Sequence, residues 1–317
     1  MIYTEVITLN KYAHLAGICF SIIFGFSFMF SKILLRNITP MGVIAYRFLV
    51  AFLVFEILRR TKIIKIKINY KKSWPILIVA IFQPVLYFIF ETYGLAKTTS
   101  AEAGLMIALI PIFVTIFSSI ILKEKPRLIQ VLFILVSFIG VVVIQLFKST
   151  LNFQADILGF ILLLFAVISA SLYNIASRSA SKTHKPHETT YVMMFLGMLS
   201  FNIIYIIQLL RNNEINRYFN NLLQLEIIFP ILYLGVLASI LAFFLVNYTL
   251  SKLPAHVSSI YANIATIVAV LAGYFFLQED LGIHHAIGGL LIIIGVYGTT
   301  RVNYLIKKKM ILDDFSN

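Results

Sequence analysis

The chain has 317 residues, of which 60% are hydrophobic and only 12% are charged, and its mean hydropathy is +0.95. In soluble globular proteins roughly a quarter of the residues are charged, so this composition excludes a water-covered globule. The net charge of +13 would suit a nucleic-acid binder, but such a protein gathers Lys and Arg on a soluble surface that long apolar runs leave no room to build. The charge instead indicates the basic cytoplasmic loops of a membrane protein, with no nucleic-acid partner.

Charged residues are confined to short gaps between apolar runs of about 18 to 24 residues, the length that a helix needs to cross the hydrocarbon core of a bilayer. Lipid offers no partner for free backbone groups, and the alternating pattern of a membrane barrel is missing, so each run predicts a helix. We therefore expect an all-α integral membrane protein with ten transmembrane helices. The expected spans are 12–35, 41–58, 74–96, 101–122, 128–147, 156–177, 190–210, 227–250, 256–277 and 283–304.

The first span is longer than the apolar region of a cleavable signal peptide, so we expect it to be retained. It holds the single cysteine, Cys19, which leaves no intrachain disulfide and no cysteine-based metal site. Lys32 lies one turn before Arg36, and both are expected to reach the outer interface, with Lys32 also a candidate substrate contact. The five phenylalanines of this span favour a lipid-facing and packing surface over a cofactor site. They are Phe20, Phe24, Phe26, Phe28 and Phe30.

Two further ionisable side chains lie inside the second and third spans, where a charge costs about 2.5 to 3.5 kcal/mol near the centre and needs a reason. Glu91, in the outer third of the third span, could bind a substrate amine or a coupling proton. The alternative is a structural ion pair with Arg47 in the second span, or with Lys32. Arg47 is expected either to contact an anion or to serve as the partner of Glu91.

Neutral hydrogen-bonding side chains complete the candidate site, although most such groups within spans only join helices. A shift of 142 residues pairs Lys32 with Asn174, so this aligned position is polar in each half. The neutral candidates for substrate binding or coupling are Tyr87, Tyr173, Asn174, Tyr248 and Asn263. The six histidines are dispersed along the chain and no glycine-rich phosphate loop occurs, so neither a metal nor another cofactor is expected.

Orientation follows from the basic residues in alternate connections. One set of connections, which includes both termini, holds 19 Lys and Arg residues, whereas the other set holds 5. Both termini are therefore predicted to be cytoplasmic.

The chain also contains a weak internal repeat. A shift of 155 residues aligns 93–144 with 248–299 without a gap and gives ten identities in 52 positions. Five spans per half is an odd number, so the second half must enter the membrane from the opposite side. Accordingly, three basic residues of the first half have uncharged or acidic counterparts in the second. Lys123, Lys125 and Arg127 correspond to Gln278, Asp280 and Gly282.

The expected domains are thus 1–150, a first five-helix repeat, and 151–317, its inverted copy. Inverted repeats place two related bundles around a site at the middle of the membrane. Glu124 and Glu279 end the fourth and ninth spans at mirror positions, where we expect a helix cap or a salt bridge.

Several stretches resemble the drug/metabolite transporter superfamily of the EamA type over essentially the whole chain. They are Tyr-Gly-Leu-Ala-Lys-Thr-Thr-Ser-Ala-Glu-Ala-Gly at 93–104, Ile-Pro-Ile-Phe at 110–113, Leu-Lys-Glu-Lys-Pro at 122–126, Tyr-Thr-Leu-Ser-Lys-Leu-Pro-Ala at 248–255 and Leu-Gln-Glu-Asp at 277–280. The resemblance implies a ten-helix carrier with cytoplasmic termini that moves amino acids, metabolites or drugs. The family places a proline in both the fourth and ninth spans, but here Pro111 is matched by Thr266, so a kink is expected in the fourth span and is left open in the ninth.

The sequence therefore predicts a secondary transporter, not an enzyme, that moves a small metabolite such as an amino acid or drug across a bacterial inner (cytoplasmic) membrane by alternating access, with export as the favoured direction. Membrane lipid is the expected surrounding partner, and a coupling proton and a second copy of the chain, as a homodimer, are further candidates. Two alternatives stay open: an integral membrane enzyme acting on a lipid-linked substrate, and a non-transporting membrane subunit or sensor.

Overall fold

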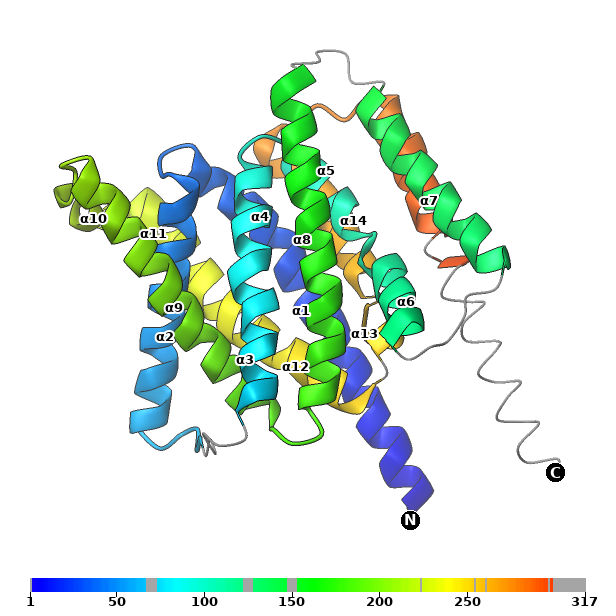
Figure 1. The fold of residues 1–317 in the computed structure, drawn as a ribbon, viewed down its shortest axis with the longest axis horizontal. Helices are drawn as coiled ribbons and strands as arrows, with labels where there is room; N and C mark the ends of the chain where they lie inside the picture. Colours follow the sequence, from blue (N-terminus) through cyan, green and yellow to red (C-terminus); the bar gives the residue numbers. More distant parts are fainter. Residues whose placement is uncertain are drawn as a thin grey trace.

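The computed structural model of the chain describes residues 2–66, 73–121, 128–146, 153–222, 224–253, 255–259, 261–295 and 297–298. Within these residues every regular element is a helix (Figure 1). The elements are α1 (Ile2–Leu35), α2 (Pro40–Arg60), α3 (Trp74–Ala80), η2 (Ile81–Leu86), α4 (Tyr87–Leu95), α5 (Ser100–Ile107), α6 (Ile110–Ile121), α7 (Leu128–Leu146), α8 (Phe153–Ala180), α9 (Pro186–Arg211), α10 (Asn216–Asn221), α11 (Leu225–Leu232), η3 (Tyr233–Leu241), α12 (Ala242–Lys252), α13 (Ala255–Ser259), α14 (Ala262–Leu277) and the last helix, Ile283–Gly295.

Eight helical stretches of the described residues are long and apolar enough to cross a membrane, which makes the protein a multi-pass membrane protein. They are Lys11–Leu35, Pro40–Arg60, Trp74–Leu95, Ser100–Ile121, Ile157–Ala180, Pro186–Arg211, Leu225–Lys252 and Val257–Leu277. The other two expected spans coincide with shorter apolar helices in the described part of the chain, Val131–Gly140 and Ile283–Gly295. Ten spans therefore stays a prediction.

The third and eighth spans are interrupted in the same manner. In the third span, Gln83 has an extended backbone (φ −149°, ψ 113°) within η2, a π-helical segment, and Pro84 follows it. The eighth span contains Pro230 in α11 and then the π-helical segment η3. The two π-helical segments end at Leu86 and Leu241, which correspond under the 155-residue shift. Proline and π-helical turns both disturb the regular backbone hydrogen bonding of a helix, so each span bends near its middle.

The fourth and ninth spans are also interrupted. In the fourth span, α5 ends at Ile107 and α6 begins at Ile110, directly before Pro111, so the expected kink is confirmed. In the ninth span, α13 ends at Ser259 and α14 begins at Ala262, although no proline stands at the position that corresponds to Pro111. The ninth span, for which the sequence left a kink open, is therefore broken as well, because proline is not the only route to a break.

Helices of the two halves pack in reciprocal pairs. The first helix of the first half, α1, packs against α12 and α14, and the first helix of the second half, α8, packs against α4 and α6. The second helices of the halves, α2 and α9, pack against each other, and so do α5 and α14. Figure 1 shows α1 and α8 running across the bundle in opposite directions.

At one edge of the molecule α7 lies beside the last helix (Figure 1). Ser137 Oγ donates a hydrogen bond to the carbonyl oxygen of Ile292 at 3.0 Å. A Cβ atom added to Gly140 would lie 2.6 Å from the carbonyl oxygen of Gly288, and one added to Gly295 would lie 2.5 Å from that of Phe133. Glycine thus allows the two backbones to approach closely, which is how helices associate in lipid without a hydrophobic driving force.

The same close approach occurs where α1 crosses α14. A Cβ atom on Gly25 would lie 2.4 Å from the Cβ atom of Val268 and 2.8 Å from the carbonyl oxygen of Ala265. Because one of these neighbours is backbone, a larger side chain at Gly25 must push the two helices apart.

We predict that Gly25→Val destabilises the folded protein by about 1 to 3 kcal/mol, the usual cost of overpacking. Thermal unfolding of the purified protein in detergent would show a lower midpoint than for the unsubstituted chain. Ile22→Val, at an exposed position three residues earlier on the same helix, is the matched control and should leave the midpoint nearly unchanged. Equal midpoints for Gly25→Val and the control would contradict the observed contact.

Candidate functional site

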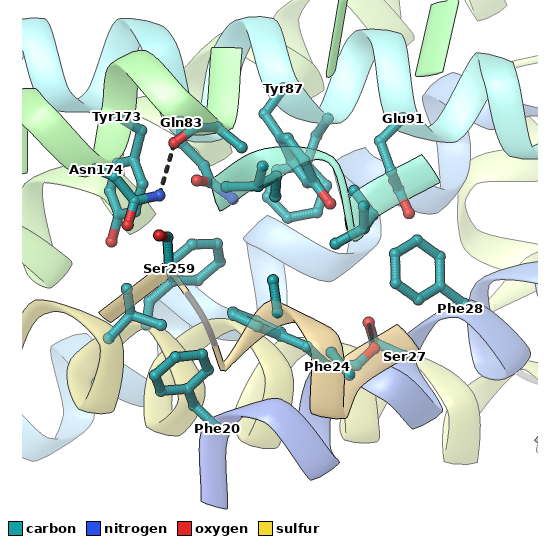
Figure 2. A pocket seen from close by; sticks show the side chains of 18 of the residues that line it. Phe20, Phe24, Ser27, Phe28, Gln83, Tyr87, Glu91, Tyr173, Asn174 and Ser259 are labelled. Carbon is teal, nitrogen blue, oxygen red and sulfur yellow. Dashed lines mark hydrogen bonds between the residues drawn. The ribbon is translucent and has the colours of Figure 1, made fainter. Parts of the chain in front are cut away.

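A cavity lies between helices of both halves, about midway along the spans (Figure 2). Its volume is about 80 Å³, which is room for several water molecules. Most of the side chains around it are buried. It is lined by Phe20, Phe24, Ser27, Phe28, Arg47, Gln83, Tyr87, Phe88, Glu91, Ile107, Ile110, Ala170, Tyr173, Asn174, Phe243, Val246, Ser258, Ser259, Ala262 and Ala265.

The interrupted spans shape this cavity. Tyr87 and Glu91 lie four residues apart on α4, so their side chains share one wall, and Gln83 precedes them at the break in η2. Figure 2 shows these side chains on one side of the cavity and those of α1, including Phe20 and Phe28, on the opposite side. Charged and amide groups therefore face a largely aromatic wall.

Arg47 supplies the positive charge of the cavity although it is only 2% exposed. Its Nε donates a hydrogen bond to Ser239 Oγ at 2.7 Å, which ties α2 to η3 in the second half of the chain. Its guanidinium carbon lies 4.3 Å from the ring centroid of Phe88, within the range of a cation–π interaction. These contacts hold the guanidinium in a fixed orientation at the cavity wall.

Glu91 supplies the negative charge and is 3% exposed. Its Oε2 accepts a hydrogen bond from Thr92 Oγ1 at 2.9 Å. Arg47 is the cation with which it interacts electrostatically, but no ion pair within 4.0 Å joins the two among the described residues. The two opposite charges therefore line the same cavity without forming a direct ion pair.

Asn247, which does not line the cavity, anchors one of its aromatic side chains. Its Oδ1 accepts hydrogen bonds from Tyr173 Oη at 2.9 Å and from Ser177 Oγ at 2.7 Å, and its Nδ2 donates to Thr190 Oγ1 at 3.0 Å. One amide thus joins α8, α9 and α12. Because the Tyr173 hydroxyl is used in this network, Tyr173 offers the cavity its ring.

Five of the eight candidate residues named from the sequence line this cavity: Arg47, Tyr87, Glu91, Tyr173 and Asn174. In Figure 2 the dashed line marks the bond from Asn174 Nδ2 to the carbonyl oxygen of Ala170, at 2.8 Å. Their roles in binding or coupling stay predictions.

The other three candidates lie outside the cavity lining. Lys32 Nζ donates to the carbonyl oxygens of Leu95, at 2.9 Å, and Thr98, at and just after the end of α4. This cation at a helix C-terminus is favourable and couples α1 to α4. Tyr248 stacks on Phe244. The buried Oδ1 of Asn263 accepts no hydrogen bond from any described residue.

The sequence analysis missed several lining residues. Gln83, Ser258 and Ser259 line the cavity and were not candidates; the pair Gln83-Pro84 inside an apolar run was the one available signal. Two of the phenylalanines expected to form lipid-facing and packing surface, Phe20 and Phe28, do lie in the hydrophobic core, and Phe24 packs against it. Phe20, Phe24 and Phe28, at four-residue spacing, face the cavity.

Glu279 caps a helix, as expected, and it caps one from the other half of the chain: its carboxylate accepts from the backbone N–H groups of Ser100 and Ala101. Its expected mirror residue, Glu124, lies outside the described residues. No group of three or more His, Cys, Asp or Glu side chains suited to a metal ion occurs within the described part of the chain.

A bundle of apolar spans with interrupted helices around a cavity that holds opposite charges is typical of membrane proteins of the transporter class. The chain belongs to the EamA-like transporter family, whose model matches residues 11–146 and again 157–301.

Relatives agree with this assignment. The chain is 36% identical over 287 residues to "Uncharacterized transporter YcxC" of Bacillus subtilis, covering 90% of this chain and 92% of that protein. It is 27% identical over 277 residues to an "Uncharacterized transporter" of Archaeoglobus fulgidus, covering 87% and 94% of the two chains. One solved crystal structure matches with a TM-score of 0.60 and 17% identity over 93% of this chain and 99% of its own, which shows a shared fold alone.

We predict that Asn247→Leu lowers the unfolding temperature of the protein, because it removes the acceptor of the Tyr173 and Ser177 hydroxyl groups at about 1 to 3 kcal/mol for each unsatisfied group, whereas Thr190 Oγ1 still donates to the carbonyl oxygen of Pro186. Thermal unfolding in detergent measures this effect. Asn220→Leu, the same substitution on the exposed face of α10, is the control and should have little effect. An unchanged midpoint for Asn247→Leu would show that the amide is dispensable.

Proposed function

We propose that this protein is a secondary transporter that moves a small amphipathic metabolite, such as an amino acid or a drug, across the bacterial cytoplasmic membrane by alternating access, with export as the favoured direction. The observation that carries the proposal is the pair of opposite buried charges, Arg47 and Glu91, in an aromatic cavity about midway along the spans. Buried charges inside spans are costly and mark substrate or ion pathways.

The cavity offers distinct groups to each part of such a solute. Glu91 would receive a substrate amine or a coupling proton, and Arg47, oriented by Ser239, would attract an anionic group. The rings of Phe24, Phe88 and Phe243 would pack against apolar portions of the solute. The geometry thus favours a solute that carries polar groups at one end and an apolar body.

Alternating access would come from two inverted five-helix repeats, 1–150 and 151–317, with both termini in the cytoplasm. Three observations support this arrangement: the reciprocal packing of helices between the halves, the matching ends of η2 and η3, and the opposite directions of α1 and α8. In inverted repeats, exchanging the conformations of the halves moves the opening of a central site from one face to the other.

We predict that Glu91→Gln lowers solute transport at least about tenfold, because it removes the charge that balances Arg47 while keeping the size of the side chain. Purified protein in liposomes would be assayed by counterflow, with a lead solute chosen as one that raises the unfolding temperature. Glu226→Gln, at an exposed carboxylate on α11, is the matched control and should transport normally. Normal transport by Glu91→Gln would remove Glu91 from the mechanism.

The proposed inversion is tested separately by topology. Single cysteines at positions 125 and 280, in the Cys19→Ser background, are counterparts in the two repeats. A thiol reagent that cannot cross the membrane should label position 125 from the cytoplasmic side and position 280 from the outer side. Labelling of both from one side would rule out the inverted repeat.

A further inference from the structure

Glu279 joins the two halves of the chain at one end of the bundle. Its Oε1 accepts a hydrogen bond from Ser100 N at 2.8 Å, and its Oε2 accepts from Ser100 Oγ and from Ala101 N, both at 3.0 Å. Ser100 begins α5, in the first half, whereas Glu279 follows α14, in the second. Hydrogen bonds to a carboxylate are stronger than those between neutral groups, and the N-terminus of a helix favours a negative charge.

The backbone around Glu279 is shaped for this contact. Gln278 adopts the left-handed conformation (φ 55°, ψ 38°), which turns the chain back so that Glu279 N donates to the carbonyl oxygen of Gly273 at 3.1 Å. Gly273 then leaves room for the carboxylate: a Cβ atom at this position would lie 2.3 Å from Glu279 Oε2 and 2.7 Å from Ser100 Oγ. Glycine is thus required here for the close approach.

The backbone donors at the start of α5 are divided between a local capping box and Glu279. Glu102 N donates to Thr99 Oγ1 at 3.1 Å, and Thr99 N donates to Glu102 Oε2 at 2.9 Å, which is a capping box within the first half. The N–H groups of Ser100 and Ala101 are left for Glu279. A helix that needed only a local cap would not require a residue 179 positions away in the sequence.

A closely packed seam between α5 and α14 connects the cavity with Glu279. At the cavity, Ile107 of α5 and Ala265 of α14 are lining residues. One turn further from the cavity, Thr266 Oγ1 donates to the carbonyl oxygen of Gly104 at 2.7 Å, and a Cβ atom on Gly104 would lie 2.5 Å from that of Ala269. Glu279 closes the seam at its far end.

From this geometry we propose that Glu279 is a gating residue, which holds the seam between α5 and α14 shut and must leave α5 when the cavity opens at that end of the molecule. The inference rests on the proposed transport function, since only a transporter needs this end to open. The simpler alternative is a cap that stabilises the fold and takes no part in opening.

The rate at which a reagent in water reaches the cavity distinguishes a gating role of Glu279 from a purely capping role. The reporter is Ser27→Cys in the Cys19→Ser background, because Ser27 lines the cavity and its Oγ hydrogen-bonds only within its own helix, to Phe24 O, at 2.7 Å. In sealed vesicles of each orientation, the rate at which a membrane-impermeant maleimide labels the reporter cysteine would be measured from each side. Glu279→Ala removes the carboxylate. Gly273→Ala keeps the carboxylate in the chain but moves it away from α5, because the added methyl group clashes with it.

Both variants should raise the labelling rate from the side at which α5 begins, by about tenfold or more, as expected for the loss of charge-assisted hydrogen bonds that hold the closed state. Labelling from the other side should not rise. Glu226→Ala, which removes an exposed carboxylate on α11, should label as the reporter alone does.

A lower unfolding temperature with an unchanged labelling rate in Gly273→Ala would overturn the gate and leave only the cap. Increased labelling from both sides equally would also overturn it, since it would indicate general loosening. If labelling rises as expected but the reporter-free protein transports no solute in any assay, the gate stands and the proposed function fails. If transport is established and the labelling rate is unchanged, the proposed function stands and the gate fails.

Discussion

Hydrocarbon cannot accept or donate a hydrogen bond, so each polar group within the spans of this protein must find its partner inside the bundle. This constraint accounts for most of the contacts between the helices. Lys32 binds the carbonyl groups that end α4, Asn247 joins three helices through one amide, and Glu279 covers the first N–H groups of α5. Each of these contacts links elements that are distant in the sequence, so satisfying the polar groups also determines how the helices are arranged.

The cavity is the place where this rule is relaxed. The third, fourth, eighth and ninth spans are all interrupted, and residues at or beside each interruption line the cavity: Gln83, Ile110, Phe243 and Ser259. Irregular backbone is tolerated at membrane depth only where it is buried in protein or borders a polar space. The breaks and the cavity therefore belong to one arrangement, since an unbroken helix at these positions would present neither the bends nor the polar side chains that shape the space.

Much of the fold could be predicted from composition, because eight of the expected spans follow directly from the length of apolar runs. Glu91 and Arg47 could also be identified as site candidates, since ionisable side chains within such runs are rare and costly. Gln83, Ser258 and Ser259 could not, because neutral polar groups occur on lipid-facing, packing and cavity surfaces alike. The direction of Phe24 or Lys32 depends on which helices of the other half lie opposite, and the periodicity of a single span carries no information on that. Likewise, no proline within the ninth span indicates the break there.

The edge formed by α7 and the last helix has a different relation to the two halves than the cavity has. Under the 155-residue shift, the contact of Gly140 with Gly288 becomes that of Gly295 with Phe133, whereas the contact of Ser137 with Ile292 becomes itself. If the halves are inverted copies, as proposed, a point that maps onto itself lies on the axis that relates them. In the proposed exchange of conformations such a point stays on that axis, so this edge would serve as the pivot for the remaining helices.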